Sequence, residues 1–256
     1  MADKTISETV EKALILLSHL AEGGHDGLSL GEAAERAGIS KPTAHRLLNT
    51  LVQQAFAERP PYSRNYRLGP AISALARVGI ATDLHGERWR TCLAEISAAT
   101  EAAAFLFVRA GDEALCVEAD FGAFLLPTLS SGIGGRVPLG LGPGSLAILA
   151  GLAESEADAI LARNAPHLRL TETRTLETLS AQIRAARCNG YAFDPGDILA
   201  EVRGVAISIV HHGNALPLAV STASLASRLP EERVADTCKL MRKAVAKALG
   251  APSQPL

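Results

Sequence analysis

Residues 39–54 read ISKPTAHRLLNTLVQQ, a stretch in which leucines alternate with polar side chains. At helical spacing, one face of this stretch and the residue after it holds Ala44, Leu47, Leu48, Leu51 and Ala55. The opposite face holds Pro42, Thr43, Arg46, Asn49 and Gln53. Arginine pairs bidentately with guanine, asparagine and glutamine pair with adenine, and threonine contacts phosphate or a thymine methyl group. The pattern therefore predicts a helix whose exposed face reads base edges in a DNA groove.

The amino end of this helix suits contact with phosphate. Ser40 is a good N-cap, and Pro42 fits the first turn, where its missing N–H costs nothing. The unpaired N–H groups of that turn add partial positive charge next to Lys41. His45 lies beside the reading face, and both phosphate contact and simple solvation stay open for it.

A basic hairpin is predicted at residues 56–69, FAERPPYSRNYRLG, where two short strands flank a proline-rich turn. Arg64 and Asn65 are expected at its tip, where they would enter an adjacent minor groove or contact its phosphates. Solvation alone is enough to explain Arg59 and Arg67. The candidate DNA contacts are therefore Ser40, Lys41, Pro42, Thr43, His45, Arg46, Asn49, Arg64 and Asn65.

Two earlier helices position these side chains. An amphipathic helix is indicated by the helical spacing of Val10, Ala13, Leu14, Leu17 and Leu20. In SLGEAAERAG, Ser29 and Glu32 have the spacing of a capping box, and Gly38 ends the helix. Two short helices joined by a tight turn and followed by a hairpin are typical of a winged helix-turn-helix. We expect this domain, mainly α with a β-hairpin wing, over residues 6–69.

The charge distribution supports a polyanionic partner. Residues 1–35 hold two basic side chains against seven acidic ones, whereas residues 36–69 hold six basic side chains against one acidic. The charge reversal begins just before the predicted reading helix, so DNA would be drawn to this segment.

In the second half, the segment SSGIGGRVPLGLGPGSLAILA has glycines at 140, 142 and 144. No Lys-Ser or Lys-Thr pair follows and no parallel βαβ unit surrounds them, so a nucleotide-binding loop is excluded. Two interpretations stay open: a loop whose backbone N–H groups hold a carboxylate ahead of a helix beginning near Ser145, or a connection that only turns tightly.

The sequence contains no recognisable catalytic or metal site. Asp194 and Asp197 have no second ligand pair and no histidine beside them, and a turn with solvated acids is an open reading. His211 and His212 fall in a predicted hairpin turn. The four cysteines are at least 20 residues apart, which favours buried reduced thiols. We therefore expect no catalytic residue, no metal and no cofactor.

The remaining elements suggest a helical linker over 70–99 and a second domain over 84–250. Strands are predicted at AAFLFVRA, EALCVEAD, AFLLPTL and GVAISIVHHGNALPLAVST, and helices at 145–154, 156–164, 175–189 and 230–249. This order favours an α+β domain with a mainly antiparallel sheet. The apolar stripe of the linker is too rich for a lone surface helix and suggests a partner subunit. No secretory signal or membrane span is evident, so a cytoplasmic protein is expected.

The chain resembles the IclR family of bacterial transcription regulators from about Thr9 to Leu249. The winged helix-turn-helix is matched by VEKALILLSHLAEGG, LSLGEAAERAGISKPTAHRLLNTLVQQAFAER and NYRLGP. The second half is matched less tightly by IRAARCNGYAFD, GVAISIV and LPLAVSTASLASRL.

That resemblance implies a GAF-like carboxy-terminal domain that binds a small effector, often an organic or aromatic acid, in a homodimer or homotetramer on double-stranded operator DNA. The implied pocket residues are Leu125, Leu129, Gly142, Pro143, Asp194, Gly204, Ser221 and Ala223. The chain departs from the family pattern at LGLGPGS, at Glu201 and at Ser208, so the effector cannot be transferred from a familiar member.

Two classes of function are alternatives to a DNA-binding regulator. One is an enzyme acting on a small acid, with the winged helix as a regulatory appendage; it would need a general acid or base with a supporting partner. The other is an interaction module whose winged helix binds protein. Sequence-selective, salt-dependent DNA affinity separates the regulator from both.

Overall fold

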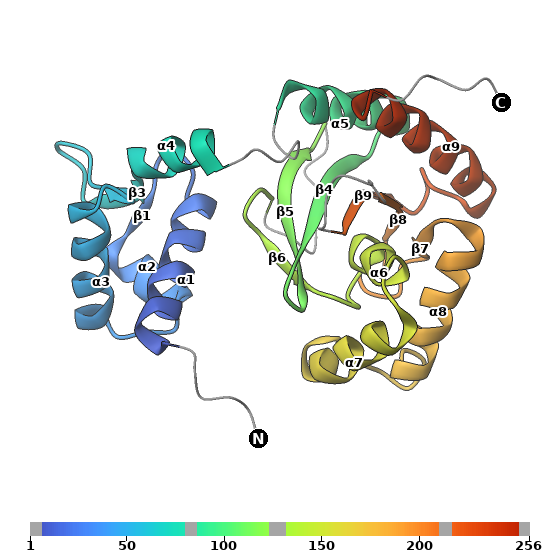
Figure 1. Cartoon of the computed structure of the whole chain (residues 1–256), viewed down its shortest axis with the longest axis horizontal. Coiled ribbons are helices and arrows are strands. Elements are labelled where there is room, and N and C mark those ends of the chain that lie inside the picture. Colours follow the sequence, from blue (N-terminus) through green and yellow to red (C-terminus); the bar gives the residue numbers. More distant parts are fainter. Residues whose placement is uncertain (1–6, 80–85, 123–131, 210–216, 251–256) are drawn as a thin grey trace. The chain divides into compact units, whose positions relative to one another are not determined.

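The computed structural model describes residues 7–79, 86–122, 132–209 and 217–250 (Figure 1). The chain divides into two compact units, Met1–Asp83 and Leu84–Leu256. Among the described residues, no helix is both long and apolar enough to cross a membrane.

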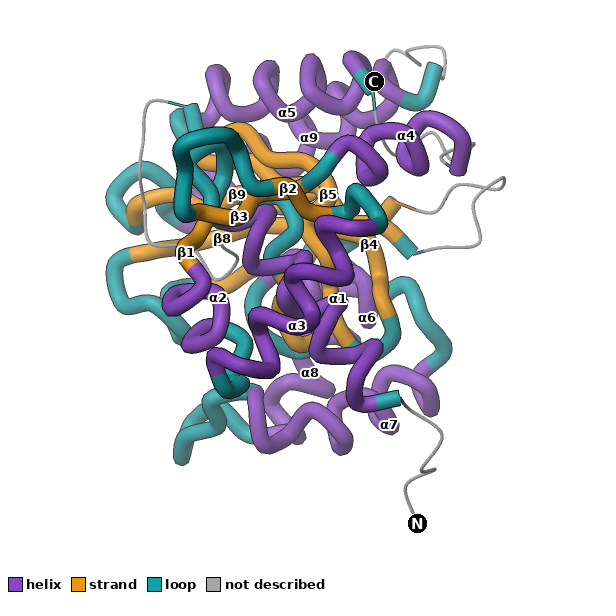
Figure 2. The backbone as a smooth tube through the Cα atoms, turned by 90° about the vertical axis from the view of Figure 1, so that its left-hand side faces the viewer, coloured by secondary structure: helices purple, strands orange, loops and turns teal. Residues whose placement is uncertain are grey.

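The first unit combines helices with a small antiparallel sheet (Figure 2). Its helices are α1 (Glu8–Glu22), α2 (Leu30–Arg36), α3 (Lys41–Gln53) and α4 (Pro70–Gly79). Its strands are β1 (Leu28–Ser29), β2 (Ala57–Glu58) and β3 (Asn65–Leu68), in the order β1-β3-β2. This arrangement confirms the predicted winged helix-turn-helix. The sequence did not predict β1, because two residues carry no periodicity.

Local hydrogen bonds account for the starts of α2 and α3. Ser29 and Glu32 form the predicted capping box at the start of α2. At α3 the side chain of Ser40 accepts a hydrogen bond from the amide of Thr43. Because these caps satisfy amides that have no partner inside a helix, they set where each helix begins.

The apolar core of this unit uses only part of the predicted stripe of α1, since Leu20 is buried in it and Leu17 packs against it. Leu16 and Leu20 are fully buried, but Val10 is 56% exposed and Leu14 is 58% exposed. The predicted stripe includes Val10 and Leu14, and spacing alone does not show which apolar face meets the core. The exposed pair leaves an apolar strip on the surface of α1.

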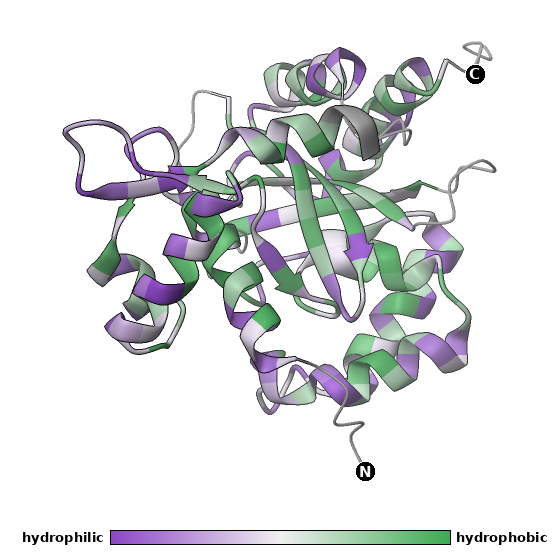
Figure 3. Cartoon of the chain, turned by 60° about the vertical axis from the view of Figure 1, so that its left-hand side comes forward, coloured by the Kyte–Doolittle hydropathy of each residue, from purple (hydrophilic) through white to green (hydrophobic). Residues whose placement is uncertain are grey.

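The second unit is built on one antiparallel sheet of six described strands, in the order β6-β5-β4-β9-β8-β7. The strands are β4 (Ala103–Ala110), β5 (Glu113–Asp120), β6 (Arg136–Pro138), β7 (Ala192–Asp194), β8 (Val202–Ile209) and β9 (Leu218–Leu225). Every neighbouring pair is antiparallel, which confirms the predicted α+β class. Figure 3 shows these strands coloured mostly as hydrophobic, as expected for a sheet covered on both faces.

Helices cover the two faces of this sheet. They are α5 (Glu87–Thr100), α6 (Pro143–Ala150), α7 (Glu154–Asn164), α8 (Leu176–Asn189) and α9 (Glu231–Ala248), with a short 3-10 turn at Ala165–His167. Alternation along β4 divides the core: Phe105 and Phe107 belong to the cluster that contains α6, α7 and α8. Leu106 and Val108 belong to the cluster that contains α5 and α9. The pocket of this unit lies in the first of these two clusters, on the side of α6.

The predicted strands AAFLFVRA and EALCVEAD coincide with β4 and β5. The predicted helices over 175–189 and 230–249 coincide with α8 and α9 within one or two residues. The predicted strand at 123–129 and the turn at His211 and His212 lie outside the described residues. The sequence did not predict the short strands β6 and β7.

Candidate functional site

The first candidate site is the exposed face of α3. Lys41, Pro42, His45, Arg46 and Asn49 are all exposed, and Thr43 is half-buried. The opposite face is buried through Ala44, Leu48 and Leu51. The fold therefore separates the two faces of α3 as the sequence predicted.

The amino end of α3 is held in place by two serine–threonine contacts. The Thr43 amide donates to Oγ of Ser40 over 3.4 Å, and the two hydroxyl oxygens lie 2.9 Å apart. One turn later, the side-chain nitrogen Nδ2 of Asn49 lies 3.5 Å from each ring nitrogen of His45. This contact at i, i+4 brings both side chains together on the exposed face.

Two of the wing arginines are engaged within the wing itself. Nε of Arg67 donates to Glu58 over 2.6 Å, which joins β3 to β2. Nε of Arg59 donates to the carbonyl of Ser63 over 3.1 Å, and its guanidinium lies 5.8 Å from the centre of the Tyr66 ring. These contacts give Arg59 and Arg67 a role in holding the wing together.

The tip of the wing differs from the predicted one. Asn65 is the first residue of β3, and its side-chain amide donates to the carbonyl of Asp26 over 3.0 Å. Arg64 is exposed, but it lies beside the turn and not at its tip. The turn itself is formed by Pro61 and Tyr62, and no periodicity in the sequence marks Tyr62 as the exposed tip.

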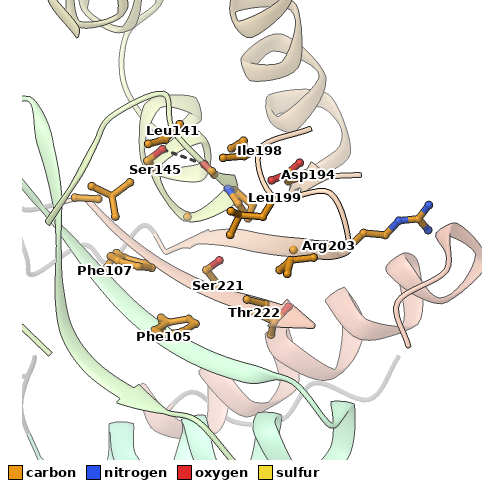
Figure 4. A pocket seen from close by; sticks show the side chains of 18 residues that line it. Phe105, Phe107, Leu141, Ser145, Asp194, Ile198, Leu199, Arg203, Ser221 and Thr222 are labelled. Carbon is orange, nitrogen blue, oxygen red and sulfur yellow. Dashed lines mark hydrogen bonds between the residues drawn. The ribbon is translucent and has the colours of Figure 1, made fainter. Parts of the chain in front are cut away.

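The second candidate site is a pocket in the other unit, between the sheet and the amino end of α6 (Figure 4). Its volume is about 60 Å³, whereas one water molecule needs roughly 10–15 Å³. The pocket therefore has room for a small organic molecule. Its principal walls are Phe105, Phe107, Leu141, Pro143, Gly144, Asp194, Ile198, Leu199, Gly204, Ser221 and Ala223.

Two phenylalanines form the apolar wall of the pocket. The rings of Phe105 and Phe107 are stacked, with centroids 5.9 Å apart. Their spacing of two along β4 places both on the same face of the sheet. A Cβ on Gly144 would lie 2.8 Å from Cδ2 of Phe107, so glycine is what lets α6 approach this wall. Strand alternation predicts this pairing, but nothing in the sequence alone connects it with a ligand.

The amino end of α6 supplies the positive side of the pocket. Pro143 is the first residue of this helix and has no N–H, and the amides of Gly144 and Ser145 have no carbonyl partner inside the helix. The hydroxyl of Ser145 is already used, because it donates to the Gly142 carbonyl over 2.9 Å and accepts from the Gly140 amide over 3.1 Å. The helix dipole and the unpaired amides together favour an anionic group at this end.

Asp194 faces the pocket from the end of β7 and is only 9% exposed. Burial raises the pKa of its carboxyl above the usual range, against hydrogen bonds that favour the charged form. These bonds come from the amides of Gly196 and Asp197, which lie 3.0 and 2.9 Å from Oδ1. Asp197 is exposed. The structure thus separates the two acids, and the interpretation as a turn with two solvated acids is wrong for Asp194.

The nearby arginines turn their guanidinium groups away from the pocket. Arg203 donates to the carbonyls of Pro195 and Leu229 over 3.1 and 3.2 Å, and Figure 4 shows its side chain pointing outward. Arg174 donates to the carbonyl of Gly140 over 2.7 Å and to that of Leu168. Within the described residues, no side-chain cation lines the pocket with its charged group directed inward.

Ser221 adds a hydroxyl to the floor of the pocket. It is 4% exposed and lies on β9 opposite Phe105 and Ala206. Among the described residues its hydroxyl has no hydrogen-bond partner. Figure 4 shows this side chain directed into the pocket, where a ligand could pair with it.

The structure brings together six of the pocket residues implied by the sequence. These are Gly142, Pro143, Asp194, Gly204, Ser221 and Ala223. Leu125 and Leu129 lie outside the described residues. The family resemblance did not point to Phe105, Phe107, Ile198 or Leu199, which also line the pocket.

Comparison with known proteins assigns both units to one family. Residues 9–61 match the IclR helix-turn-helix domain, and residues 76–249 match the bacterial transcriptional regulator IclR C-terminal domain. The chain belongs to the IclR family of bacterial transcription regulators.

Individual IclR-family proteins resemble the chain over nearly its whole length. It is 26% identical to the HTH-type transcriptional regulator XynR of Escherichia coli, over 97% of this chain and 99% of that protein. An IclR transcriptional regulator from Alicyclobacillus acidocaldarius superposes with a TM-score of 0.71 at 24% identity, covering 96% of this chain and 98% of that one. An IclR homologue from Microbacterium hydrocarbonoxydans, solved with 4-hydroxybenzoate, gives a TM-score of 0.64 at 22% identity, covering 92% and 96%.

Proposed function

We propose that this IclR-family protein is a sequence-specific DNA-binding regulator whose affinity for its operator is changed by a small acid in the pocket of the second unit. The observation that carries the proposal is that one chain combines two features, each suited to one part of this function. One is a capped helix with an exposed donor face, and the other is a pocket lined by Asp194, Ser221 and the amino end of α6.

In the first unit, which we take as residues 6–69, α3 enters the major groove. Arg46 and Asn49 then face base edges, while Ser40, Lys41, Pro42 and Thr43 lie at the end of the helix that approaches phosphate. Arg64 and His45 contribute phosphate contacts at the edges of this surface. For Asn65, its bond to Asp26 favours a supporting role in which it holds the wing against the loop before β1.

In the second unit, which we take as residues 84–250, the pocket suits a small acid with an apolar body; the carboxy-terminal part of the predicted linker over 70–99 is α5, which packs in the core of this unit. The stacked Phe105 and Phe107 offer an apolar surface, and the amides at the start of α6 can donate hydrogen bonds to a carboxylate. Leu125 and Leu129 stay in the proposed pocket on the family resemblance alone. The structural neighbour solved with 4-hydroxybenzoate supports an aromatic acid as one candidate.

The protonation state of Asp194 affects whether a carboxylate can bind in the pocket. A charged Asp194 would repel a carboxylate in the same small pocket, whereas a protonated Asp194 would donate a hydrogen bond to it. Because burial has already raised the pKa of Asp194, protonation on ligand binding costs less than it would for an exposed aspartate. We infer that an acidic effector binds together with a proton.

The active form in this proposal is a homodimer or a homotetramer in the bacterial cytoplasm. Val10 and Leu14 expose an apolar strip on α1, and Leu75 on α4 is 56% exposed. Burial of such side chains against a second copy would be favourable. Paired recognition helices related by a two-fold axis would bind a near-palindromic site with half-sites about one helical turn apart, or a multiple of it.

The enzyme alternative is not favoured. Asp194 has no partner acid or histidine among the pocket residues, and its Oδ1 serves the turn that follows β7. The described residues hold no group of three or more His, Cys, Asp or Glu side chains that could bind a metal ion. The relatives found are named as transcription regulators.

The test is selection of duplexes from a random DNA pool by the full-length protein, followed by titration of the selected sequence at several salt concentrations. A regulator of this kind gives a single enriched motif and an affinity that falls steeply as salt rises. Recovery of unselected DNA, with equal affinity for all duplexes, would contradict the proposal. A protein-docking module would show no DNA affinity.

A further inference from the structure

The tip of the wing is a tight turn that places an aromatic residue in an unfavourable backbone conformation. The amide of Ser63 donates to the carbonyl of Pro60 over 3.0 Å, with Pro61 and Tyr62 between them. Tyr62 has φ +68°, in the left-handed region. Proline followed by a residue with positive φ is the pattern of a type II turn, which normally holds glycine or asparagine at the second of these positions. Tyrosine there strains the backbone.

Hydrogen bonds hold this turn rigidly. Nε of Arg59 donates to the carbonyl of Ser63 over 3.1 Å, which joins the two sides of the turn. The amide of Asn65 donates to Oγ of Ser63 over 3.0 Å, and the side chain of Asn65 donates to Asp26 over 3.0 Å. The backbone of the turn is therefore tied to the rest of the unit and projects Tyr62 from it.

Within its own chain, the ring of Tyr62 gains nothing that offsets this strain. Its relative exposure is 109%, so no part of the side chain is covered. Tyr66, four residues later, shows the ordinary use of a wing tyrosine, because it is only 5% exposed and packs in the core. A residue in a strained conformation that packs against nothing in its own unit is a candidate for contact with a partner.

The surroundings of Tyr62 favour DNA as that partner. Arg64 is exposed two residues away, and the segment from 36 to 69 is strongly basic. Figures 1 and 2 show the loop between β2 and β3 projecting on the same side of the first unit as α3. A tyrosine has only two rotatable side-chain bonds and the backbone that carries it is already held by the turn, so little conformational entropy is lost when it binds.

We propose that the ring of Tyr62 inserts into the minor groove beside the major-groove site of α3 and makes the protein prefer A·T pairs there. This inference rests on the proposed function and adds a specificity determinant to it. Guanine places its N2 amino group in the minor groove, where it obstructs an apolar ring, whereas A·T pairs carry no such group there. Because the contact is not ionic, its selectivity should be independent of salt.

The first test compares Tyr62 variants on the duplex that the full-length wild-type protein selects from a random pool. Tyr62→Gly removes the ring and suits a left-handed φ, so we expect an unchanged or higher Tm and about tenfold weaker binding, the scale of one lost aromatic contact with nucleic acid. Tyr62→Phe keeps the ring and should bind as the wild type does. Arg64→Ala, the matched control, should lower the salt slope by about one, whereas Tyr62→Gly should leave it unchanged.

The second test changes the base pairs that flank the selected motif. Replacement of flanking A·T by G·C should weaken the wild type several-fold and leave Tyr62→Gly unaffected. Replacement by inosine·cytosine, which lacks the N2 amino group, should weaken neither protein. If Tyr62→Gly binds as tightly as the wild type, or retains the full G·C penalty, the role of Tyr62 is overturned. If the wild type selects no motif at all, the proposed function fails as well.

Discussion

Gly204 on β8 lies directly against Pro143, the first residue of α6. A Cβ built on Gly204 would stand 2.8 Å from Cγ of Pro143 and 2.7 Å from the carbonyl oxygen of Thr222. Both distances are too short for any side chain without movement of the neighbours. The amino end of α6 can therefore reach the pocket only because residue 204 has no side chain.

Gly204→Ala should consequently destabilise the second unit and reduce the pocket. Overpacking of this kind costs about 1–3 kcal/mol in free energy of unfolding, measurable by urea denaturation. Gly31→Ala is the matched control, because the nearest atom to its added Cβ would be 3.7 Å away and the position is helical. The control should stabilise the protein by about 0.5–1 kcal/mol. Equal stability of the Gly204 variant and the wild type would show that α6 is not held against β8 in this way.

Arg46→Ala should weaken binding to the selected operator by roughly 1–3 kcal/mol, because a bidentate contact with a base edge is lost. The variant should also lose discrimination at one base position. Arg184→Ala is the control, since Arg184 is an exposed arginine of the second unit whose only described ion pair, with Glu154, spans 3.9 Å. Fluorescence anisotropy with labelled duplexes measures both. Operator affinity unchanged by the loss of Arg46 would remove α3 from the reading role.

Asp194→Asn should remove the pH dependence of acid binding. In the wild type a charged Asp194 opposes a bound carboxylate, so affinity should rise as pH falls through the raised pKa of Asp194. Asparagine is neutral at every pH and its side-chain oxygen can still accept the amides of Gly196 and Asp197. Calorimetry with 4-hydroxybenzoate as the first probe should show an affinity that depends on pH in the wild type and an affinity that is independent of pH in the variant. If the affinity of both proteins depends on pH in the same way, a group other than Asp194 takes up the proton.

Leu14→Glu should weaken self-association, because Leu14 is 58% exposed on the apolar strip of α1. Loss of one buried leucine costs about 1.5–3 kcal/mol, so the dissociation constant of the dimer should rise at least about tenfold. Leu170→Glu is the control at a site that is also exposed, at 39%, in the second unit. Analytical ultracentrifugation distinguishes the two variants. A wild-type association state in Leu14→Glu would exclude α1 from the interface.

Much of the fold follows from local patterns in the sequence. The capping pairs Ser29–Glu32 and Ser40–Thr43 set the starts of α2 and α3, and the strand-like segments AAFLFVRA and EALCVEAD coincide with β4 and β5. The orientation of α1 followed only in part: Leu20 is buried as its spacing indicated, but Val10 and Leu14 are as apolar as Leu16, and only the tertiary packing decides which of these three is buried.

The sites were predictable to different extents. The reading face of α3 is a property of one helix, so its spacing was sufficient to predict its exposure. The pocket joins β4, α6, β7, β8 and β9 across more than 100 residues, and the sequence reached Asp194 and Ser221 only through the family resemblance. The spacing of two between Phe105 and Phe107 puts both on one face of β4, yet the contact of Phe107 with Gly144 depends on the packing of α6. The exposure of Tyr62 depends on a turn geometry that no periodicity encodes.

The most direct test of the central claim is operator affinity measured with and without a saturating small acid, in the wild type and in Asp194→Ala. A panel of aliphatic and aromatic carboxylates, beginning with 4-hydroxybenzoate, provides the probes. We predict that an acid which binds the wild type shifts operator affinity by roughly tenfold, the usual scale of coupling between two sites. The same acid should leave the operator affinity of Asp194→Ala unchanged, because alanine offers neither the hydrogen bond of the protonated carboxyl nor the acceptor for the amides of Gly196 and Asp197. Both proteins should bind the operator equally well in its absence. An acid that occupies the pocket in an Asp194-dependent manner, yet leaves the operator affinity of the wild type unaltered, would contradict the account.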